Sequence, residues 1–205
     1  MYTALVATSQ TVAAFLRNRL ESDSNLGPFF NPALGGTMIV SLSNPQEMLE
    51  NNLEGLSVWL YRVVRDEELL NAPAVRETGG MRMPPLPVRL HLLVTPLRTT
   101  DVANGPELEQ VILGKVLHSL YDHPCFRGAD LQGDLAGTQS EFHLRLEPMT
   151  LEDITRVWNA LDAPYELSVS YELTLARIRS DRLEPGGPVL TVDPRTGVIV
   201  ASEGV

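Results

Sequence analysis

Strict alternation of apolar and polar side chains over residues 167–176 is the strongest structural signal in the sequence. Leucine, valine and tyrosine occupy every second position, with serine, glutamate and threonine between them. Successive side chains of a β-strand point to opposite faces, so this pattern predicts a long strand with one face on a core and the other in water. The chain is therefore expected to contain a β-sheet.

Four more segments have the alternation, or the β-branched and aromatic content, that is typical of strands. In the third of them Val88 begins the positions of one face, while Arg89, His91 and Leu93 lie on the other. Pro96 is expected to end this strand, because proline has no N–H to donate. The four predicted strands cover residues 37–43, 56–65, 88–95 and 142–146.

Three segments have the 3.6-residue apolar period of amphipathic helices. Pro106 suits a first helical turn, and Pro124 is expected to stop that helix. Thr150 is a predicted N-cap, with Glu152 and Asp153 at the positive end of the helix dipole. The predicted helices cover residues 3–20, 106–123 and 151–161.

The order of these elements predicts a single α/β (α+β) domain over residues 1–179, with a mixed sheet of about five strands covered by two or three helices. Residues 25–36 and 71–87 are rich in glycine and proline and are expected to be irregular. Residues 180–205 are predicted to form a linker and a C-terminal β-hairpin arm. Such an arm either folds back on the domain or pairs with another chain.

Charge and composition exclude several classes of function. The 205 residues carry 16 Lys and Arg against 26 Asp and Glu, a formal charge of −10, which disfavours nucleic-acid and anionic-membrane partners. No apolar run approaches the roughly 20 residues that span a bilayer. Residues 1–19 have no secretory pattern, and the single cysteine, Cys125, fits a reducing compartment.

The chemistry-bearing residues form no recognisable catalytic or metal-binding motif. His118 and His123 are five residues apart, which places them on divergent helix faces, so a metal site there is disfavoured. Cys125 is expected to pack as a small apolar side chain at a helix exit. Trp59 and Trp158 are expected to be core anchors. We therefore expect no catalytic residue, no metal and no cofactor.

Particular segments resemble the tail-terminator, or cap, proteins of extracellular contractile injection systems, which are phage-tail-like particles. The individual motifs are weak, but their order and spacing are specific, and the resemblance extends from the first helix to about Arg179. The segments that carry it are residues 15–17, 58–61, 84–90, 92–95, 113–120, 123–124, 151–161 and 164–171.

The resemblance implies a structural subunit without enzymatic activity. Its implied partners are other copies of itself in a ring, usually a hexamer, together with the contractile sheath protein and the inner tube protein. The ring would end polymerisation and anchor sheath to tube. It would assemble in the bacterial cytoplasm, in a particle that can be released.

Two alternatives remain open: a tail terminator of a contractile phage, and a small-molecule-binding or enzymatic α/β domain with its site beneath residues 71–87. If the chain is a cap subunit, the candidate residues for contact with the sheath protein or a neighbouring subunit lie in two segments. They are Met81 and Met83 in the proline-rich segment, and Val189, Val192, Val198 and Val200 in the arm.

Overall fold

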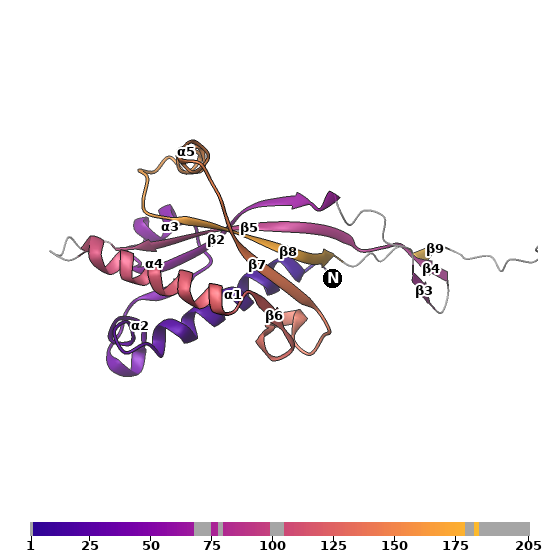
Figure 1. The fold of residues 1–205 in the computed structure, drawn as a ribbon, viewed down its shortest axis with the longest axis horizontal. Coiled ribbons are helices and arrows are strands. Elements are labelled where there is room, and N and C mark those ends of the chain that lie inside the picture. Colours follow the sequence, from indigo (N-terminus) through magenta and orange to yellow (C-terminus); the bar gives the residue numbers. More distant parts are fainter. Residues whose placement is uncertain (1, 68–74, 78–79, 99–104, 179–182, 185–205) are drawn as a thin grey trace, which may run out of the picture.

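The computed structural model describes residues 2–67, 75–77, 80–98, 105–178 and 183–184. A curled sheet of six strands, in the order β1-β2-β5-β8-β7-β6, forms its centre (Figure 1). Strands β1 and β2 are parallel and all other neighbours are antiparallel, so the sheet is mixed, as predicted. The strands are β1 (Ile39–Ser41), β2 (Gly55–Arg65), β5 (Leu86–Leu97), β6 (Cys125–Arg127), β7 (Glu141–Glu147) and β8 (Val169–Ile178).

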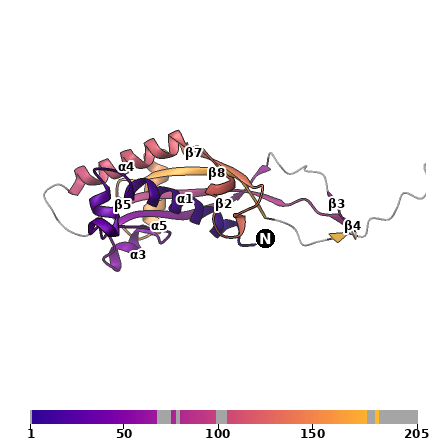
Figure 2. The same cartoon turned by 90° about the horizontal axis from the view of Figure 1, so that it is seen from below.

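Helices cover both faces of this sheet (Figures 1 and 2). Helices α1 (Ala4–Glu21) and α4 (Gly105–Asp122) lie on one face, and α5 (Leu151–Ala160) lies on the other. The three predicted helices are thus confirmed. The Thr150 cap is also confirmed, because its Oγ1 accepts a hydrogen bond of 3.2 Å from the Asp153 backbone N–H.

Shorter elements connect the long ones. The segment 25–36, predicted as a loop, contains helix α2 (Gly27–Phe30) and a 3₁₀ turn (Pro32–Leu34). Helix α3 (Pro45–Glu50) links β1 to β2, and further 3₁₀ turns occupy Gly128–Asp130 and Gly133–Leu135. None of the helices in the described residues has the length and hydropathy needed to cross a bilayer.

The main core lies between the sheet and helices α1 and α4. Alternate residues of β5 from Val88 to Val94 are buried in it, together with Leu16 of α1 and Ile112 of α4. Leu93 points to the other face, where it packs against Ile154 and Trp158 of α5 in a smaller cluster. The predicted division of residues 88–95 into two faces is confirmed.

The second face of β8 was predicted to be wet, and this prediction is wrong. Ser168, Ser170 and Glu172 are 7%, 2% and 6% exposed. Helix α5 covers one end of this face, where Trp158 donates a hydrogen bond to Ser168. Toward the other end Arg145 from the neighbouring strand bonds Glu172. Neighbouring elements therefore supply partners that allow polar side chains to be buried.

The prediction that Pro96 ends its strand is also wrong, because β5 continues to Leu97. Pro96 is paired with Leu56 of β2, whereas the pairing of β5 with β8 stops at Val94. Residue 96 is therefore at a local edge of the sheet, with one neighbouring strand. Proline is tolerated at such a position because its missing N–H interrupts no second ladder.

The segment 71–87, predicted to be irregular, contains two strands in its described part. Strands β3 (Val75–Glu77) and β4 (Gly80–Arg82) are antiparallel, and β9 (Leu183–Glu184) adds to β4 as a third strand. This small sheet projects from the main body (Figures 1 and 2). The start of the predicted linker thus pairs with the proline-rich segment, while the predicted hairpin lies outside the described residues.

Candidate interaction surfaces

A polar cluster lies on the sheet face beside α5. One carboxylate oxygen of Glu147 accepts a hydrogen bond of 2.6 Å from the Ser170 hydroxyl and one of 3.2 Å from the Tyr61 hydroxyl. His91 Nδ1 lies 3.0 Å from the same oxygen. Burial alone would raise the pKa of Glu147, but the hydrogen bonds from Ser170 and His91 outweigh it and lower that pKa below its ordinary value.

A second charged group continues along the same face. Arg89 lies 3.1 Å from Asp66 and 3.4 Å from Glu172, and Arg145 approaches Glu172 to 2.7 Å. Two guanidinium groups thus face two carboxylates that are almost fully buried. Removal of one partner would leave a buried charge, so we assign this network to holding β5, β7 and β8 in register.

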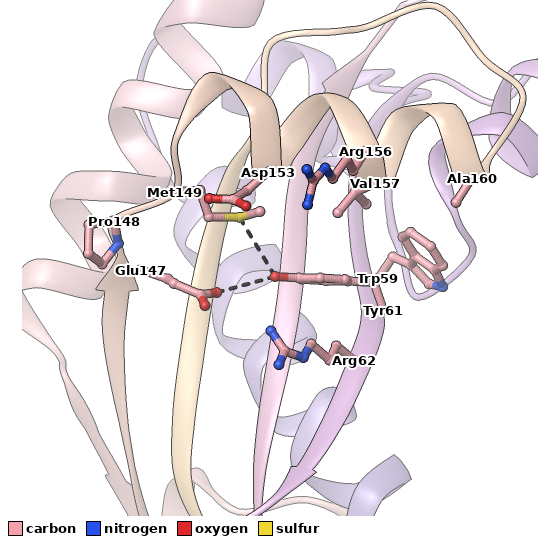
Figure 3. A pocket seen from close by; sticks show the side chains of 10 residues that line it. All are labelled: Trp59, Tyr61, Arg62, Glu147, Pro148, Met149, Asp153, Arg156, Val157 and Ala160. Carbon is pink, nitrogen blue, oxygen red and sulfur yellow. Dashed lines mark hydrogen bonds between the residues drawn. The ribbon is translucent and has the colours of Figure 1, made fainter.

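An open pocket of about 500 Å³ lies between α5 and β2 (Figure 3). Figure 3 shows the Tyr61 hydroxyl directed at Glu147 and at the sulfur of Met149, with Arg62 and Arg156 beside them. Burial raises the pKa of Tyr61, so its hydroxyl stays protonated at neutral pH. The polar atoms of the floor bond one another, which leaves few of them to bind a ligand. The small-molecule hypothesis had placed a site elsewhere, beneath residues 71–87.

A second hollow, of about 590 Å³ and mainly apolar, lies between α4 and β7. Tyr121 and Leu146 at its rim are 84% and 52% exposed. Leu120, Leu144 and Tyr171 belong to the main core and form its base. Exposed apolar surface of this kind is more typical of a contact surface than of a reaction site.

The two histidines singled out in the sequence have different partners. His118 is exposed and lies 3.2 Å from Asp122 on the same helix. His123 is stacked on Phe15, with 4.8 Å between ring centroids, and lies 3.2 Å from Asp130. The two rings thus contact different carboxylates, and His123 follows the end of α4 at Asp122.

Cys125 was expected to pack at a helix exit, whereas it lies in the edge strand β6. The backbone enters the sheet directly after Pro124, whose carbonyl accepts a hydrogen bond from the Leu144 N–H. Burial, with Glu141 nearby, raises the pKa of the Cys125 thiol. Trp158 is a core anchor as predicted, while Trp59 is half-buried and lines the pocket of Figure 3.

The predicted contact residues are only partly within the described chain. Met81 lies half-buried in β4, where it pairs with Glu184, and Met83, also half-buried, follows directly after β4. The four arm valines lie outside the described residues. Sequence reasoning missed the Glu147 cluster, because its members come from four strands with unrelated spacing.

Comparisons with known proteins match most of the chain. The model of the Pvc16 N-terminal domain family matches residues 7–191. The sheath/tube terminator of the extracellular contractile injection system PVC, in its extended state, shares the fold with a TM-score of 0.61 and 16% identity over 97% of this chain. The tube-terminating cap of the anti-feeding prophage matches with a TM-score of 0.50 and 19% sequence identity over 87% of this chain.

This chain spans 65% of the length of the first of these proteins and 62% of the second. Curated proteins give no match. The family match nevertheless covers far more than half of the sequence, and it coincides with the described domain and its projection. The chain belongs to the Pvc16 N-terminal domain family.

Proposed function

We propose that this chain is a structural cap subunit that ends the growth of an inner tube and its contractile sheath. The observation that carries the proposal is the fold match over 97% of the chain to a sheath/tube terminator. A second match, to a tube-terminating cap, supports the same role. The family of the chain is consistent with both.

In this role several copies close into a ring, which we expect to be a hexamer, on the last layer of tube and sheath. A closed ring leaves no free interface of its own for further addition, so it stops a helical or stacked polymer. Assembly takes place in the bacterial cytoplasm, before release of the particle. The formal charge of −10 keeps such a ring from binding nucleic acid there.

The projecting sheet is the part of the described fold best suited to reach a neighbour. It stands away from the main body (Figure 1), and its outer strands β3 and β9 are edges. Edge strands present backbone N–H and C=O groups that a strand from another protein can pair with. β9 belongs to the predicted linker and arm, residues 180–205, and the valines of the arm would supply side-chain packing in such a pairing.

No catalytic step is part of this proposal. The Glu147 cluster and the Arg89 network satisfy their hydrogen bonds largely within the fold, as expected of groups that stabilise a sheet. Replacement of His118 by Gln or of Cys125 by Ala is therefore expected to leave particle assembly intact.

The decisive experiment compares particles from cells that carry the intact gene, no gene, or a variant. Met83→Glu places a charge directly after strand β4 of the projecting sheet, and Leu151→Glu places the same charge on α5, where Leu151 is 73% exposed. Loss of the protein should give tubes and sheaths of irregular length. Met83→Glu should do the same and Leu151→Glu should not.

Truncation removes the arm either without β9 or together with it. A chain ending at Glu184 keeps β9, and one ending at Arg182 loses it. Both should unfold at the temperature of the full chain, because the main core lies within residues 2–173. Both should cap poorly. Normal sheath lengths in every strain, including the one without the gene, would refute the proposed function.

A further inference from the structure

Three side chains of types that commonly ligate metals lie together on one face of the β6–β7 ladder. Cys125 stands directly opposite His143 in the register, and Glu141 precedes His143 by two residues, which places it on the same face. The three potential ligand atoms all lie within 4.8 Å of one another. His143 Nε2 is 2.9 Å from a carboxylate oxygen of Glu141.

The opposite face of the same two strands is locked in the core. Phe126 and Phe142 are paired in the register, are almost fully buried and stack with 5.2 Å between centroids. These rings fix the backbone of both strands from the inside. Cys125 and His143, which neighbour these two phenylalanines and point outward, therefore have fixed backbone positions.

The donor set is that of a transition metal, because a thiol and an imidazole are poor ligands for calcium or magnesium. Zinc binds sulfur at about 2.3 Å and nitrogen or oxygen at about 2.0–2.2 Å, in a tetrahedron. Those bonds place neighbouring ligand atoms roughly 3.3–3.6 Å apart. The spacing observed here reaches this geometry by small side-chain rotations.

We propose that Cys125, Glu141 and His143 bind one Zn²⁺ ion, with the fourth position open to solvent. The thiolate and the carboxylate balance the charge of the ion, and His143 binds through Nε2 with its proton on Nδ1. Two further charged groups act on the site: Arg127, which pairs with Glu141 in the register, and Asp130, which has the opposite sign.

Binding at this site releases a proton. Burial and Glu141 raise the pKa of the Cys125 thiol, so the free protein carries S–H at neutral pH. Coordination breaks this S–H bond, forms the S–Zn bond and passes the proton to solvent. His143 must present Nε2 without a proton, so any proton held there moves to Nδ1 or to solvent.

The consequence is a clamp at the edge of the sheet. Strand β6 has three residues and one neighbour, β7, and the ion would join the two through their side chains. The proposal is independent of the cap function, since it concerns the domain alone.

The test uses the full chain, first stripped of metal with a chelator, and Co²⁺ as a spectroscopic substitute for zinc. The wild type should show a near-ultraviolet thiolate-to-cobalt band at one equivalent, which Zn²⁺ displaces. Zn²⁺ should also raise the melting temperature, because it binds only the folded site. Cys125→Ser and His143→Gln should each weaken zinc binding by more than about tenfold.

His118→Gln is the matched control, since His118 is an exposed histidine beside an acid outside the cluster. It should bind zinc like the wild type. In the presence of chelator all variants should have the melting temperature of the wild type. If one of the two ligand variants misfolds, Glu141→Gln is used in its place. A cobalt complex without the thiolate band, or zinc binding unchanged in Cys125→Ser, would overturn the proposal.

Discussion

Replacement of Glu147 by Leu should destabilise the domain more than replacement by Gln, because the buried partners of Glu147 need an acceptor. His91 is 5% exposed, and its Nε2 has no partner in the described part of the chain. Nδ1 bonds Glu147, so Glu147→Leu leaves both ring nitrogens unpaired. Ser170 and Tyr61 are less affected, since their hydroxyls lie 3.0 Å apart and keep each other as partners.

The magnitude follows from this count. One newly unpaired buried polar group costs about 1–3 kcal/mol, which is the expected loss in free energy of unfolding for Glu147→Leu. Glu147→Gln keeps an oxygen acceptor in the same place and loses only the charge. Its cost should be about 1 kcal/mol.

The effect should also depend on pH. The folded protein holds the pKa of Glu147 below its ordinary value of 4.5. A carboxyl with a lowered pKa stabilises the fold above its unfolded pKa, and this stability is lost as the pH falls through the folded pKa. The difference between wild type and Glu147→Gln should therefore be full at pH 7 and shrink below about pH 4.5.

Urea unfolding followed by tryptophan fluorescence measures these differences, since Trp59 lines the pocket beside Glu147 and Trp158 lies above it on α5. Equal losses for Glu147→Leu and Glu147→Gln would show that charge, not the acceptor, is what matters. If Glu147→Leu unfolds at the same urea concentration as the wild type, the buried partners of Glu147 do not need its acceptor, and the prediction is refuted.

Three other substitutions test the packing. Gly55→Ala should unfold the β1 edge and lower the melting temperature, because its φ is +134° and an added Cβ would lie 2.0 Å from the Ile39 carbonyl oxygen. Trp158→Ala should cost about 3–5 kcal/mol in urea unfolding, since the side chain is 1% exposed. Asp23→Asn should cost less than about 1 kcal/mol at pH 7, because the contact with Lys115 is partly exposed. That loss should vanish in acid, since Lys115 lowers the pKa of Asp23.

Long elements were predictable because periodicity accumulates over their length. The helices at residues 4–21, 105–122 and 151–160 and the four longer strands were all found close to their predicted bounds. Their capping and turn residues act locally, as Thr150 does, so the sequence alone displays them.

Several short elements were missed because three to six residues span only one or two periods, too few to stand out from chance. Strand β6 and helix α2 are examples. Helix α3 had a readable signal, however: Asn44 caps it by accepting a hydrogen bond from Glu47 N–H, and Pro45 occupies its first position.

Burial of polar side chains was the least predictable feature, because it depends on partners that are distant in sequence. Glu172 is buried through Arg89 and Arg145, and Glu147 through His91 and Ser170. The grouping of Cys125 with residues of β7 likewise depends on register, which alternation within one strand cannot reveal. The resemblance to cap proteins supplied the functional hypothesis that these local patterns lacked.

The most direct test of the cap function is a cryo-EM reconstruction of both ends of tube-and-sheath particles assembled with this chain. We predict a closed ring of copies of the chain on the last layer of tube and sheath, at the end away from the baseplate. Particles whose two ends both lack the chain, or particles that carry it along their whole length, would contradict a cap function.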